Sequence, residues 1–239
     1  MSDPAGMLLS VRGEARQVVP PDFVTMTAVV AVTRGSKAEA VRTAAANLDS
    51  LTAELAARGG VALEVGTERR PLTWSAQSAT TRAERSFDKQ TGAHELTGQV
   101  TAMVEVVITV RAFELLDPLG TVLAALETVS VRQVSWQVDW DNPGWQEVRA
   151  AAIHAAIRKG RDYAAALGGS LRAVEHIADA GLLGGDNIQT QLIARSAGGF
   201  ASLAGGGESD PPSLDPVPQE LTAVIEARFS ADGVSLTAP

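Results

Sequence analysis

The side chains best suited to chemistry gather in the stretch SWQVDWDNPGW, residues 135–145, which holds three of the chain's four tryptophans. Two aspartates and a glycine of this stretch match positions one, three and six of an EF-hand calcium loop: Asp139, Asp141 and Gly144. The match then fails, because position five is Pro143 and position twelve, where a bidentate glutamate belongs, is Ala150. We therefore expect no metal ion in this loop.

The same stretch is better interpreted as the junction of a strand and a helix. Residues 141–143, DNP, are typical of a helix start in which an aspartate or asparagine cap precedes proline at the first helical position. Trp136 and Trp140 alternate onto one strand face and are interpreted as core, because an indole buries a large apolar area. Trp145 opens the helix, where it can act as a packing contact or lie at a subunit contact.

A polar and aromatic cluster on the following helix is the best candidate for ligand binding. Its members are Trp145, His154, Arg158 and Asp162, of which the last three share one helix face. An exposed, ion-paired stripe is the simpler interpretation. The remaining histidines, His94 and His176, have no second histidine at metal-ligand spacing.

Recognisable catalytic motifs are missing from the sequence. There is no cysteine, no GxSxG nucleophile elbow, no Walker A loop and no GxGxxG turn. The arginines at 69–70 and 82–85 could bind an anion, but mixed charge of this kind is typical of a solvated surface. We therefore predict a protein without catalytic, cofactor-binding or metal-binding residues.

Charge and composition narrow the possible partners. The 239 residues carry a formal net charge of −8 without a basic cluster, which disfavours nucleic acid and anionic membrane surfaces. The N-terminal residues lack the basic region and apolar run of a secretory signal, so we expect a cytoplasmic protein. No apolar run reaches the length of about 18 residues that a membrane-spanning helix needs.

Hydrophobic periodicity places the elements that must position these residues. Strands are predicted at 7–18, 23–32, 63–74, 97–111, 131–140, 173–180 and 220–230. Helices are predicted at 36–58, 114–128 and 144–167. The order predicts an α+β fold with a ferredoxin-like split βαβ core, an antiparallel sheet with helices on one face. This core is extended by an N-terminal strand, a third long helix and C-terminal strands.

The chain is predicted to form one domain over 1–239 with two excursions. Residues 76–95 are polar and charged and lie between two strands, so they are expected to form a protruding hairpin tip. Residues 181–218 are rich in glycine and proline and are expected to be flexible.

The predicted strand at 97–111 is the expected site of self-association. It is apolar around both faces near its centre, and apolar faces or unpaired edges are usually covered by a partner. The predicted oligomer interface comprises Val104, Val106, Ile108 and Trp145.

Several short motifs together resemble the SIMPL domain family, named after a signalling molecule that interacts with a mouse pelle-like kinase. They are Val11-x-Gly13-Glu14-Ala15, Pro21-Asp22 before a strand, Arg58-Gly59 after a helix, Val65-x-Thr67 with Pro71, and the helix end Ala164-Ala165-Ala166-Leu167-Gly168. The resemblance covers about residues 8–181 and the final strand.

The resemblance implies a shared fold and supplies no catalytic residues. Many bacterial members are exported, some forming ring- or cage-like homo-oligomers and some linked to stress tolerance; the absence of a signal here departs from them. The leading hypothesis is a non-catalytic homo-oligomer that acts as a scaffold. The alternatives are a small-molecule-binding module or unrecognised enzyme, and an adaptor that binds another protein through 181–218.

Overall fold

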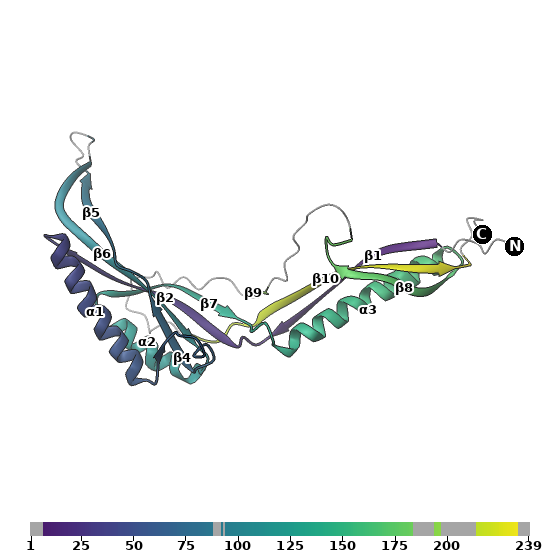
Figure 1. Cartoon of the computed structure of the whole chain (residues 1–239), viewed down its shortest axis with the longest axis horizontal. Coiled ribbons are helices and arrows are strands. Elements are labelled where there is room, and N and C mark those ends of the chain that lie inside the picture. Colours follow the sequence, from purple (N-terminus) through teal and green to yellow (C-terminus); the bar gives the residue numbers. More distant parts are fainter. Residues whose placement is uncertain (1–6, 88–91, 93, 184–193, 197–213, 234–239) are drawn as a thin grey trace. The chain divides into compact units, whose positions relative to one another are not determined.

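Two sheets, one with two helices on one face and the other with a single helix, make up the computed structural model (Figure 1), which describes residues 7–87, 92, 94–183, 194–196 and 214–233. The chain divides into two compact units. Unit 1 draws on Met1–Pro20, Val138–Gly198 and Pro218–Pro239, and unit 2 on Pro21–Gln137 and Gly199–Val217. The sequence was expected to form one domain over 1–239, and this expectation did not include a division into two units. That the chain acts as a single domain stays a prediction.

Unit 2 has the predicted split βαβ order. Its described elements are β2 (Phe23–Arg34), α1 (Lys37–Ala57), β3 (Val61–Ala62), β4 (Leu72–Ala76), β5 (Thr80–Phe87), β6 (His94–Val110), a 3-10 turn η1 (Phe113–Leu115), α2 (Leu116–Ala125) and β7 (Val129–Gln137). The sheet order is β3-β4-β6-β2-β7, and β5 pairs with β6. All neighbours are antiparallel except β3 and β4. The predicted α+β, ferredoxin-like fold is confirmed.

Both ends of α1 are set by local sequence signals. Ser36 caps the start, its Oγ accepting a hydrogen bond from the backbone N–H of Glu39 at 3.3 Å. Gly59 follows the end with φ of 78°, a backbone conformation that glycine adopts without strain. Buried Leu51 and Leu55 then pack α1 against the sheet.

Two predicted elements of unit 2 differ from those observed. The predicted strand at 63–74 is interrupted, because the Thr67 hydroxyl closes a turn with the N–H of Glu64 at 2.8 Å and Gly66 has φ of 87°. The predicted hairpin tip at 76–95 is largely strand, since β5 pairs with the first part of β6. Residues 88–91 and 93 lie outside the described residues.

Unit 1 packs one helix on a second sheet. Its described elements are β1 (Met7–Val19), α3 (Pro143–Ala166), β8 (Ser170–Asp179), β9 (Ala194–Ser196) and β10 (Gln219–Asp232). The order β1-β10-β8 is antiparallel throughout, and β9 pairs with the start of β10. Most of the predicted flexible excursion at 181–218 falls outside the described residues.

Helix α3 lies close to β1 because both surfaces carry small residues. A Cβ added to Gly13 would lie 2.1 Å from the carbonyl oxygen of Ala152 and 2.7 Å from the backbone nitrogen of Ala156. Both alanines are fully buried. The glycine of the Val11-x-Gly13 motif is thus a packing requirement, which no larger residue meets without moving the helix.

Candidate functional site

Alternate residues of β10 point away from α3 and form a polar surface on unit 1. This outer face holds Glu220, Thr222, Val224, Glu226, Arg228 and Ser230, all half-buried, opposite the exposed even-numbered residues of β1. Ion pairs join the two strands, Arg12 to Glu226 at 3.1 Å and Arg16 to Glu220 at 3.8 Å. The odd-numbered residues of β10 from Leu221 to Ala231 are buried and pack under α3.

Glu226 is the most highly connected group on this face. Its Oε1 accepts a hydrogen bond from Arg12, and its Oε2 accepts one from the backbone N–H of Leu183 at 3.4 Å. The backbone N–H of Gly181, then the Arg12 side chain and the Leu183 N–H, hold the pKa of the Glu226 carboxyl below its ordinary value, against the raising effect of desolvation.

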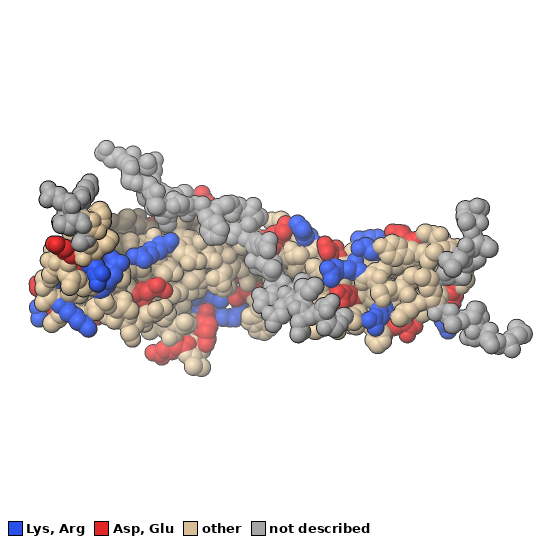
Figure 2. Space-filling view, turned by 90° about the horizontal axis from the view of Figure 1, so that it is seen from above, with Lys and Arg blue, Asp and Glu red and all other residues tan. Residues whose placement is uncertain are grey.

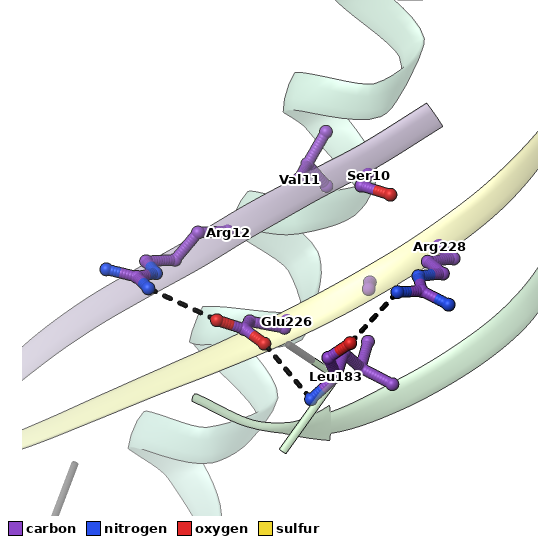
Figure 3. Close-up of a pocket in the computed structure, with 7 residues that line it drawn as sticks. Ser10, Val11, Arg12, Leu183, Glu226 and Arg228 are labelled. Carbon is purple, nitrogen blue, oxygen red and sulfur yellow. Dashed lines mark hydrogen bonds and ion pairs between the residues drawn. The ribbon is translucent and has the colours of Figure 1, made fainter. Parts of the chain in front are cut away.

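Arg228 completes a clamp on the backbone of Leu183 (Figure 3). Its Nη2 donates to the Leu183 carbonyl oxygen at 2.9 Å, so both backbone polar groups of Leu183 are held. The two clamping side chains are two positions apart on one face of β10, as strand geometry requires. The chain leaving β8 is therefore fixed to the outer face of the sheet.

A pocket of about 330 Å³ opens beside this clamp, lined by Ser10, Val11, Arg12, Leu183, Glu226, Ala227 and Arg228. Its carboxylate, on Glu226, is already paired with Arg12 and a backbone N–H group, and no histidine stands in the lining beside the Ser10 hydroxyl. The arrangement serves to bind a polar backbone segment, and it does so with the chain's own residues.

The predicted interface residues lie inside the subunit. Val104, Val106 and Ile108 are buried in the core of unit 2, and Trp145 is buried in the core of unit 1. The Trp145 Nε1 donates to the backbone oxygen of Asp139 at 2.9 Å. The subunit's own helix packing removes these four side chains from solvent. The expectation that they face another subunit stays a prediction.

The three neighbouring tryptophans have different surroundings. Trp136 is half-buried and packs edge-on against Phe113, with ring centroids 5.5 Å apart, as a core residue. Trp140 is 82% exposed, so its interpretation as core is wrong. The strand β7 ends at Gln137 and a turn follows, in which Asn142 N–H donates to the Asp139 oxygen at 3.1 Å, so strand alternation does not extend to Trp140.

The other candidate residues do not converge on a site. His154, Arg158 and Asp162 are exposed on α3, while Trp145 is buried and apart from their stripe. Asn142 Oδ1 accepts from the Gly144 N–H at 2.8 Å, which confirms the helix start. Within the described ranges, no group of three or more His, Asp or Glu side chains is placed to hold a metal ion.

The β5–β6 hairpin, residues 80–87 and 94–99, is here called the arm. The sequence predicted a protruding hairpin at 76–95 but not the apolar side chains exposed on it. The arm extends beyond the rest of its sheet (Figure 1) and residues 94–99 are all exposed. Phe87 is 54% and Leu96 66% exposed, and the Phe87 ring lies 5.1 Å from that of His94. The signal in the sequence was an apolar residue in each of two polar strands.

The base of the arm is held by hydrogen bonds between its strands and β2. Glu84 Oε1 accepts from the Thr101 hydroxyl at 2.6 Å, and Thr101 Oγ1 lies 2.7 Å from Thr33 Oγ1. The Thr101 hydroxyl, followed by the charge and hydrogen bond of Arg82, lowers the pKa of the Glu84 carboxyl, while desolvation opposes the shift.

A second missed surface is the outer edge of β8, which pairs with no strand of the described residues other than β10. Val174 is 53% and Ile177 50% exposed, although both lie on the face that α3 covers elsewhere.

Charge on the visible surface is mixed: on the face that Figure 2 shows, Lys and Arg side chains are interspersed with Asp and Glu. Such a surface does not attract a polyanion over a wide area.

Comparison with known proteins connects both units to one family. No described helix is long and apolar enough to cross a membrane. A search of the curated proteins finds no match. The family model of SIMPL, described as a protein of unknown function (DUF541), matches residues 9–229, which include the core of unit 2 and all of the unit 1 core except Ala231. The chain belongs to the SIMPL family.

Proposed function

We propose that the protein is a non-catalytic homo-oligomer, a scaffold whose subunits form a closed ring or cage. The observation that supports this proposal is the arm, whose two strands project from the sheet with apolar side chains exposed. The described part of the chain supplies no second layer to cover them.

Contact with another subunit would stabilise a two-stranded hairpin such as the arm. Successive residues of a strand point to opposite faces, so the exposure of residues 94–99 leaves both faces of the arm open. Isolated two-stranded hairpins are marginally stable in water, because they bury little apolar surface. Contact with another subunit would bury Phe87 and Leu96 and stabilise the arm.

Two separate surfaces favour an assembly larger than a dimer. The arm belongs to unit 2, whereas the β8 edge belongs to unit 1. One self-complementary contact closes a dimer, and a second, different contact joins dimers into a ring or cage.

The alternative functions have less support. The exposed stripe of His154, Arg158 and Asp162 offers no enclosed site for a small molecule. The pocket beside Glu226 is occupied in part by the backbone of Leu183. The adaptor hypothesis rests on 181–218, most of which lies outside the described residues, and stays a prediction.

Mutation of the arm tests the proposal. The variant Phe87→Ser with Leu96→Ser should assemble into smaller species than the unmodified chain, as measured by light scattering behind a sizing column. Gln99→Ser is the matched control, because Gln99 is exposed on the same arm and polar. A folded double variant of parental mass would rule out the arm as a contact, and an unmodified protein of subunit mass would rule out the assembly itself.

A further inference from the structure

The two edges of the unit 1 sheet differ in how they are protected. On β1, the Lys159 ammonium reaches from α3 and donates to the backbone oxygen of Arg12 at 2.8 Å. Charged side chains placed on an edge in this way discourage pairing with another strand. On β8, the described residues provide pairing on the β10 side alone, and Val174 and Ile177 are exposed.

We infer that β8 pairs antiparallel with β8 of a second copy, about a two-fold axis between Glu175 and His176. This inference rests on the proposed homo-oligomer and specifies one of its contacts. The pairing would join the two unit 1 sheets into one, with both α3 helices on the same face, and would leave neither β8 edge open.

The order of residues along β8 is self-complementary in this register. Val174 lies opposite the partner's Ile177, so two exposed apolar side chains cover each other. Arg172 lies opposite the partner's Asp179, and Glu175 lies opposite the partner's His176. Each contact occurs twice because the axis is two-fold, and like charges do not meet.

The pairing of β8 with β10 has two irregularities, of which one leaves Arg172 and the other Glu175 as an extra residue. The irregularity at Glu175 makes the inferred register geometrically consistent for its apolar pair. The pairing of β8 with β10 shifts between Arg228 and Phe229, which leaves Glu175 as an extra residue. Val174 and Ile177 are consequently opposite Phe229 and Ala227, both buried under α3, and share one face although they are three positions apart. Residues opposite each other in an antiparallel pair must share a face, and these two do.

Neighbouring registers are less favourable. A shift by two residues in either direction would place Val174 opposite the partner's Glu175 or the partner's Asp179. A carboxylate would then be set against the apolar side chain, and the Arg172–Asp179 ion pairs and the Glu175–His176 contacts would be lost. The inferred register is the one that matches both charge and hydrophobicity.

Disulfide trapping in the full-length chain tests the register, because the protein has no cysteine of its own. Purified Val174→Cys and Ile177→Cys variants are mixed and oxidised, and covalent dimers are measured on a non-reducing gel. Opposite Cα atoms are about 4.5–5.5 Å apart, within disulfide range. Identical positions are diagonal neighbours about 7–8 Å apart, too far for an unstrained bond.

The mixture should form covalent dimers, whereas each variant alone should remain largely uncrosslinked. A mixture of Val174→Cys with Leu8→Cys, exposed on β1, is the control for random collision. The β8 pairing would be overturned if the Val174→Cys and Ile177→Cys mixture crosslinked no more than this control. The proposed assembly would still hold in that case if the reduced mixture had an oligomeric mass. A reduced mixture at subunit mass would contradict both.

Discussion

The Glu84 carboxylate accepts a hydrogen bond from the Thr101 hydroxyl at 2.6 Å, which joins the two strands of the arm at its base. Since this bond lowers the pKa of Glu84, its contribution is present when Glu84 is ionised and is lost as the pH falls through the depressed pKa. Acid should therefore loosen the arm before it unfolds the core.

Thr101→Val tests this relationship while retaining the shape of the side chain. The variant removes the donor to Glu84, so the arm amides should exchange with solvent several-fold faster, as measured by hydrogen exchange. The titration of Glu84, followed by NMR, should move toward its ordinary pKa. Unchanged exchange and an unchanged Glu84 titration would show that the bond does not secure the arm.

The clamp on Leu183 gives a second prediction. Glu226→Gln weakens the contact with the Leu183 N–H and removes the ion pair with Arg12, so the Leu183 amide should exchange faster. Lowering the pH through the depressed pKa of Glu226 should have the same effect in the unmodified protein, because protonation removes the charge.

Glu220→Gln is the matched control for that clamp. Glu220 lies on the same face of β10 and pairs with Arg16. If hydrogen exchange of the Leu183 amide were accelerated equally in both variants, the amide would be responding to the general charge of this face. That result would contradict the clamp.

Close packing between β1 and α3 predicts a large effect of a single methyl group. Gly13→Ala should reduce the free energy of unfolding by about 1–3 kcal/mol or more, because the added Cβ meets backbone atoms of α3. The comparison is Gly35→Ala, whose added Cβ has no atom within 4 Å. Denaturation in urea measures both, and equal stability of the two variants would contradict the packing described.

The burial of Ile108 predicts an effect on folding. Ile108→Ala should cost about 2–5 kcal/mol of stability, as other large-to-small substitutions in cores do. Its unfolding midpoint in urea should fall accordingly. If Ile108→Ala instead kept the parental free energy of unfolding and changed the mass of the assembly, β6 would be a contact between subunits.

Local patterns and simple geometry accounted for the parts of the structure that were predicted. The Ser36 cap and the alternation along β6 depend on residues close in sequence, and they placed the split βαβ core. The direction of the β6 side chains was predicted less well. Val106 and Ile108 could face either a helix or a partner from periodicity alone, and the packing of α1 decides it.

The site features that sequence reasoning missed depend on long-range contacts or on element ends. Glu226 and Leu183 are 43 positions apart, and no local pattern connects them. Trp140 is exposed because β7 ends three residues earlier, at Gln137, although the alternation continues in the sequence. The exposure of Val174 and Ile177 reflects where α3 ceases to cover the sheet, which periodicity does not define.

The mass of the purified 239-residue chain in solution, measured by light scattering behind a sizing column, shows whether the subunits assemble as proposed. A ring or cage would appear as a discrete species whose mass is a multiple of the 24.8 kDa subunit and greater than that of a dimer. A single species at 24.8 kDa across the accessible concentration range would contradict the proposed assembly.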